Sequence, residues 1–219
     1  LLLEALEEAG FGAAALAREG PVVANMASWL AGFERDRRAD RPTLLVEMRG
    51  ESTLDGPAGP FRMRARADRI EVRGGSGVVI DFKTGQSPSK KQVASHLAPQ
   101  LTLTGAILAR DGFPGVARVR PDELLYVRLS GRRPPGEVKP VATDAADLCE
   151  AAWSGLAERV AEYDQPEHPY RSWVAREAVS SETTTAIAND SGIVTSAGFR
   201  SGKTAASCLR MSTWIVGDR

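Results

Sequence analysis

Two aspartates and a lysine are the residues whose types and spacing in this sequence indicate chemistry. Asp68 lies in a segment where apolar and charged residues alternate, and Asp81 and Lys83 follow the β-branched run of residues 78–80. Between these segments, residues 74–77 read Gly-Gly-Ser-Gly, which is typical of a tight turn. The two segments are therefore expected to pair as a β-hairpin.

The register of this hairpin decides which side chains meet. With a two-residue turn at Gly74 and Gly75, Asp68 stands directly across from Asp81. With a four-residue turn, Asp68 stands across from Lys83 and diagonal to Asp81. Since alternate residues of a strand share a face, all three side chains lie on one face of the sheet in both registers. Facing carboxylates lie about 5 Å apart and repel, so a cation is expected between them.

Magnesium fits this set of groups, because it prefers oxygen ligands, keeps several waters and commonly takes one or two carboxylates. Asp68, Asp81 and the backbone carbonyl of Phe82 are the predicted ligands. The Lys83 ammonium is then placed to orient or deprotonate a water, or to stabilise charge on a phosphate. The predicted chemistry is metal-assisted hydrolysis of a phosphodiester. The alternative is a pair of solvated surface charges, and an isolated Asp-x-Lys does not distinguish the two.

The segments around these residues predict an α/β fold with a mixed central sheet flanked by helices. Helical periodicity marks residues 1–40, 99–112 and a segment from an Asp144 cap to Tyr163. Strand patterns mark residues 43–49, 61–72, 78–80, 123–129 and 137–141. We therefore expect a helical N-terminal part over 1–40, a nuclease-like core over 41–170 and an atypical tail over 171–219.

Composition sets the limits of these predictions. The 219 residues carry 28 basic and 28 acidic side chains, so contact with a polyanion would depend on local patches. No apolar run approaches the length of a membrane span and no signal peptide opens the sequence, which favours a cytoplasmic protein without membrane contact. Leu1 already lies in a helical pattern, so the chain is expected to be part of a longer one.

Three short motifs in combination resemble the signature of RecB-like nucleases in the PD-(D/E)XK superfamily. They are residues 67–70 (Ala-Asp-Arg-Ile), residues 79–85 (Val-Ile-Asp-Phe-Lys-Thr-Gly) and residues 99–101 (Pro-Gln-Leu). Residues 87–93, ahead of the third motif, add a likeness to the C-terminal nuclease domain of the AddB family. The resemblance covers roughly residues 20–170.

This resemblance implies a restriction-endonuclease-like fold and a magnesium-dependent DNA nuclease, with Mn²⁺ as a substitute metal. Asp68 and Asp81 would be metal ligands, Lys83 the catalytic lysine and Gln100 a helix residue that faces the site. The implied setting is an AddB-type helicase-nuclease subunit that acts on DNA in double-strand break repair and recombination beside an AddA-like subunit. The alternatives are an inactive DNA-binding or subunit-organising module of the same fold, or a stand-alone RecB-like exonuclease.

The sequence also departs from the family pattern. Thr104 stands where the family helix often carries a tyrosine or an acidic residue. The only histidines are His96 and His168, so the N-terminal helix has none to offer a metal. Cys149 and Cys208 are too distant in sequence to supply an iron-sulfur cluster, and none is expected.

Further residues are candidates for supporting roles. Glu47, on the preceding strand, is a possible accessory acid or an exposed residue on a strand edge. Lys90 and Lys91 follow the active-site strand closely and are expected to contact DNA. Residues 197–204 imitate a phosphate-binding loop, but only 15 residues follow Thr204, too few for the rest of a nucleotide-hydrolysing domain.

Overall fold

The computed structural model describes residues 4, 8, 10, 12–110, 112–168 and 215–218, the last four by their backbone only. The phosphate-loop-like residues 197–204, Cys208 and nearly all of the tail after Tyr170 lie outside the described residues. No helix in the described ranges is long and apolar enough to span a membrane.

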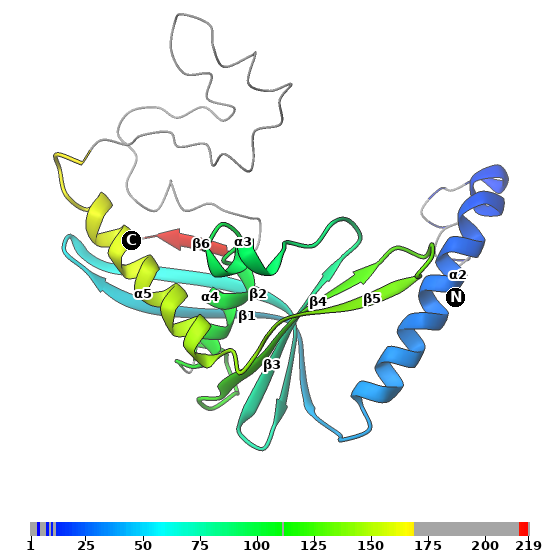
Figure 1. Ribbon diagram of the computed structural model, residues 1–219, viewed down its shortest axis with the longest axis horizontal. Helices are drawn as coiled ribbons and strands as arrows, with labels where there is room; N and C mark the ends of the chain where they lie inside the picture. The colour runs from blue at the N-terminus through cyan, green and yellow to red at the C-terminus, as the bar shows by residue number, and fades with distance from the viewer. Residues whose placement is uncertain are drawn as a thin grey trace, which may run out of the picture.

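One mixed β-sheet forms the centre of the structure (Figure 1). Its strands lie in the order β1 (Thr43–Gly56), β2 (Gly59–Arg73), β3 (Ser76–Lys83), β4 (Arg120–Leu129) and β5 (Gly136–Thr143). The pairing of β3 with β4 is parallel, whereas β1–β2, β2–β3 and β4–β5 are antiparallel. The mixed central sheet expected from the sequence is confirmed. A short strand, β6 (Ile215–Asp218), also pairs with β2, although the sequence did not predict structure there.

Helices cover both faces of this sheet. On one face, α4 (Gln100–Leu108) and α5 (Ala146–Tyr163) pack over a large apolar core that includes Phe61, Ile70 and Leu124. On the other face, Trp29 and Phe33 of α2 (Ala13–Arg37) pack on a smaller apolar cluster. That cluster consists of Val78, Ile80, Leu125 and Val127. Because β3 and β4 are covered on both faces, their sequences are nearly continuous apolar runs.

The turn between β2 and β3 has two residues, Gly74 and Gly75, which both adopt positive φ (52° and 90°). Such a turn favours glycine because a side chain is strained in that conformation. It fixes the antiparallel register, with Arg69 opposite Ile80 and Glu71 opposite Val78. The first of the two registers considered from the sequence is therefore the one present.

Charged residues join α2 to its face of the sheet. Glu71 of β2 is completely buried and forms ion pairs with Arg37, Arg69 and Arg73. Arg69, only 4% exposed, also forms an ion pair with Glu34 of α2. In this network, named below the Glu71 cluster, the protein itself supplies three cationic partners for the buried Glu71 carboxylate.

The boundaries of the helices differ in places from the predictions. A short helix that was not predicted, α3 (Lys90–Ala94), begins after Ser89, whose side chain forms a capping box with Gln92. The predicted end of α4 at Gly112 was too late, since the helix ends at Leu108. The predicted Asp144 cap of α5 was wrong: the N-cap is Ala145, and Asp144 pairs instead with Arg120.

Candidate active site

Asp68 lies at a kink in β2. Residues up to Ala67 turn their odd-numbered side chains toward the large core, but beyond the kink the even-numbered Ile70 faces that core. The paired ladder with β3 ends at Arg69 and Ile80, where the two strands separate. The Asp68 carboxylate spans the gap and accepts a hydrogen bond from the Phe82 backbone N–H at 2.8 Å. The kink therefore holds this acid between the two strands.

Asp81, Lys83 and Gln100 meet at the end of β3. The Lys83 Nζ lies 2.7 Å from Asp81 Oδ2 and donates a hydrogen bond to Gln100 Oε1 at 3.3 Å. Gln100 is the first residue of α4, so this helix supplies the second contact of the ammonium. The structure thus brings together three of the residues singled out in the sequence, with Asp68 beside them on the neighbouring strand.

The electrostatics of Asp81 distinguish it from a surface carboxylate. It is only 4% exposed, and burial raises its pKa to about 6. The ammonium of Lys83 acts in the opposite direction, and the negative charge of Asp68 adds to the rise in the pKa. Two carboxylates and one ammonium leave a net negative charge in a partly dry site, which a cation would stabilise.

Glu47 lies in β1 at the level of Asp68, because its neighbours Val46 and Met48 pair with Arg69 and Ala67. Its carboxylate pairs with Arg66 at 2.6 Å, and its side chain is about half exposed (49%). Its φ of 53° is unusual for a residue with a side chain, and such strain concentrates at functional sites. The structure therefore brings Glu47 to the strand beside Asp68 but directs its charge toward an arginine.

Lys90 and Lys91 lie on α3, close after the end of β3 in the sequence, and both are exposed. Helix α3 also contacts β5, the outer strand on that side of the sheet. The helix that carries both lysines therefore lies against β5, and their predicted contact with DNA stays a prediction.

Tyr126 is a neighbour of the site that the sequence patterns did not identify. The parallel register sets it directly beside Asp81, and the Lys83 Nζ lies 5.9 Å from the centre of its ring. Its hydroxyl is buried and has no hydrogen-bond partner among the described residues. Burial, with the Asp81 charge as a smaller cause, raises the pKa of this phenol, so it stays protonated. The sequence could not identify Tyr126 because its position depends on the register between β3 and β4, two strands that lie far apart in the chain.

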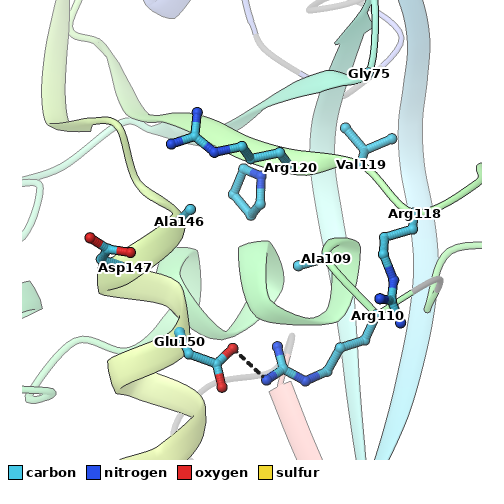
Figure 2. A pocket seen from close by; sticks show the side chains of 10 residues that line it. Gly75, Ala109, Arg110, Arg118, Val119, Arg120, Ala146, Asp147 and Glu150 are labelled. Carbon is cyan, nitrogen blue, oxygen red and sulfur yellow. Dashed lines mark hydrogen bonds and ion pairs between the residues drawn. The ribbon is translucent and has the colours of Figure 1, made fainter.

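A cavity of about 490 Å³ lies away from these residues, at the opposite end of β3 (Figure 2). It is lined by Gly75 of the β2–β3 turn, by three arginines and by Asp147 and Glu150 of α5. Arg110 pairs with Glu150 at 2.6 Å, and Arg120 pairs with Asp144, so most of its charges are matched. None of the predicted site residues lines it. We favour the end of β3 as the functional site because the unbalanced carboxylates are there.

Residues 2–173 match the family model described as the PD-(D/E)XK nuclease superfamily. The match covers most of the chain and includes Asp68, Asp81, Lys83 and Gln100. The chain belongs to this superfamily.

Relatives of this superfamily member are found in the genus Rickettsia. Uncharacterized proteins of Rickettsia bellii and Rickettsia typhi are 30% and 33% identical to it over 82 residues. Those residues make up 37% of this chain but only 10% of each relative, so this chain matches a small part of much longer proteins. The crystal structure of SSO0001 aligns with 69% of this chain and 64% of the SSO0001 chain, at 15% sequence identity. The TM-score of this alignment is 0.35, which is too low to indicate a shared function.

The donor atoms at the end of β3 fit a divalent cation of the magnesium type. Asp68 and Asp81 supply two carboxylates there, and in the described ranges no group of three or more His, Cys, Asp and Glu side chains is arranged to hold a metal. Two carboxylates with water and a backbone carbonyl are a usual set for Mg²⁺ or Mn²⁺. Burial is the largest cause of the raised pKa of Asp81, and the contact with Lys83 lowers that pKa only in part.

Proposed function

We propose that this chain is a metal-dependent nuclease domain that hydrolyses DNA phosphodiesters. The observation that carries the proposal is the contact of the Lys83 ammonium with both Asp81 and Gln100, next to Asp68. Membership of the PD-(D/E)XK nuclease superfamily supports the same chemistry.

In this proposal each residue has a separate task. Asp68 and Asp81, with the backbone carbonyl of Phe82, hold Mg²⁺ or Mn²⁺. At this position a divalent ion would supply Lewis-acid chemistry, activation of a water and charge neutralisation at the phosphate. Lys83 orients that water or stabilises the developing negative charge, and Gln100 holds the ammonium in position through its hydrogen bond. Lys90 and Lys91 bind the DNA backbone, and Glu47 supports the metal site only if it leaves Arg66.

We further propose that the domain belongs to an AddB-type helicase-nuclease subunit that acts in double-strand break repair with an AddA-like partner. The motifs at residues 79–85 and 87–93 support this assignment. The match to about a tenth of much longer relatives agrees with a nuclease module carried by a large protein.

The test is DNA cleavage by the full-length protein with Mg²⁺, compared between wild type and Asp81→Asn. Asparagine keeps the size of the side chain but removes its charge, so we expect cleavage to fall by about 10²- to 10³-fold without a loss of thermal stability. Equal cleavage by both proteins would contradict the proposal and favour a non-catalytic module.

The partner is tested separately, by purification of the tagged full-length protein from its native cells. An AddB-type subunit should bring down a large helicase in stoichiometric amount. Full nuclease activity without a helicase would instead favour a stand-alone exonuclease.

A further inference from the structure

Arg128 lies on the same face of the sheet as the candidate active site. Along β4, Leu124 and Tyr126 face the large core, whereas Leu125 and Val127 face the α2 side. Arg128 continues the first set. The parallel register sets it directly beside Lys83, at the point where β3 ends. Since neighbouring strands lie about 4.8 Å apart, the two cationic side chains leave the sheet side by side.

The guanidinium of Arg128 has one buried nitrogen, Nε, without a hydrogen-bond partner in the described part of the chain. Glu137 stands opposite it on β5, but the Glu137 carboxylate pairs with Lys139 at 3.3 Å. Arg69 and Arg73 of the Glu71 cluster also have a buried Nε without a hydrogen-bond partner, but both form ion pairs with Glu71, whereas Arg128 forms no ion pair with a carboxylate among the described residues. A charged donor without a partner costs stability, which is tolerated where a ligand provides the acceptor.

The row of cations extends beyond Arg128. Lys139 of β5 stands opposite Tyr126, on the same face, and its side chain is 36% exposed. Helix α3 contacts β5 and carries the exposed Lys90. Cations therefore follow one another from β3 across β4 to β5, and they start at Lys83.

We propose that Arg128 binds a backbone phosphate of the DNA substrate, next to the phosphate that faces Lys83. The DNA strand would then run from the end of β3 across β4 toward β5 and α3. A guanidinium suits this task because its planar set of N–H donors matches the oxygens of a phosphate. This inference rests on the proposed nuclease function and assigns part of its substrate-binding surface.

The test compares Arg128→Met with Arg118→Met in the full-length protein. Arg118 is exposed and lines the cavity at the other end of the sheet, so this control removes the same charge far from the site. Binding of labelled single-stranded DNA is measured without divalent cations at several salt concentrations. For Arg128→Met we expect about 5- to 10-fold weaker binding, and a slope of log K against log salt that is smaller by about 0.7. For Arg118→Met we expect the wild-type values.

Thermal stability separates a binding role from a structural one. Loss of an unsatisfied buried donor should leave the melting temperature of Arg128→Met unchanged or raised. In Glu137→Gln, removal of the opposing negative charge should tighten DNA binding. A lowered melting temperature in Arg128→Met with unchanged affinity would overturn the inference and make Arg128 a structural partner of Glu137.

Cleavage assays distinguish the failure of this inference from that of the proposed function. In Arg128→Met we expect KM to rise more than kcat falls. If the wild type cleaves DNA, and Arg128→Met also binds and cleaves DNA normally, the inference about Arg128 is overturned and the nuclease function stands. A wild type that binds DNA through Arg128 but does not cleave it overturns the nuclease function and leaves the inference standing. A wild type that does neither overturns both.

Discussion

Two buried clusters of charge lie on opposite faces of the same hairpin, and they are balanced differently. On the α2 face, Glu71 is fully buried and has three arginine partners. On the α4 face, Asp81 is nearly as buried but has one ammonium partner and a second carboxylate beside it.

The difference concerns where the compensating charge comes from. In the Glu71 cluster the protein supplies it, and the cluster fastens α2 to the sheet. At the end of β3 the protein supplies less than the carboxylates need, so a ligand can add the rest. Burial of charge alone therefore does not support a functional site, and our proposal rests on the incomplete compensation of the carboxylates at the end of β3.

The largest effect is expected for Lys83→Met. Loss of the ammonium should lower kcat for DNA cleavage by about 10²-fold or more, because a donor aimed at developing charge is removed. The same change should tighten the binding of Mn²⁺, since the ammonium that competes for Asp81 is gone. Calorimetric titration and cleavage kinetics on one preparation check both. Weaker Mn²⁺ binding together with normal cleavage would contradict the assigned role.

Glu71→Gln should affect folding and leave the chemistry intact. It leaves three arginines facing a neutral amide in a buried setting, so we expect a loss of about 3–5 kcal/mol in the free energy of unfolding. Glu51→Gln is the matched control. Glu51 pairs with Arg64 at the surface, where the expected loss is below about 1 kcal/mol. Urea unfolding measures both, and equal losses would show that burial of the cluster adds nothing.

The smallest effect is expected for Glu47→Gln. The pair of Glu47 with Arg66 is about half exposed, so its loss should change stability by less than about 1 kcal/mol. Cleavage should fall by no more than about threefold if Glu47 stays with Arg66. A much larger fall, with stability unchanged, would show that Glu47 turns toward the metal during the reaction.

Local signals in the sequence were enough to predict the β2–β3 hairpin that carries the proposed site. The glycine pair at 74 and 75 predicted the turn and its register, which sets Asp68 at the level of Asp81. The kink at Asp68, where the alternation of β2 shifts by one residue, was not predicted. The mixed sheet with flanking helices also followed from the order of periodic segments.

What the sequence did not reveal depends on contacts between distant segments. Tyr126 and Arg128 stand beside Asp81 and Lys83 only because β4 pairs in parallel with β3 in one register, after a crossover through α3 and α4. Glu71 has two partners at i±2 on its own strand, Arg69 and Arg73, but its third partner, Arg37, comes from α2, more than 30 residues away, and no local pattern couples Glu71 to it. The Asp144 cap failed because Arg120, on another strand, holds that carboxylate.

The most direct measurement is calorimetric titration of Mn²⁺ into the full-length wild type, Asp81→Asn and Glu71→Gln. The site at the end of β3 should bind one Mn²⁺ in the wild type and in folded Glu71→Gln with the same affinity. In Asp81→Asn that affinity should fall at least about tenfold, because one of two carboxylate ligands is lost. Undiminished binding by Asp81→Asn would contradict the claim that the undercompensated carboxylates are a cation site.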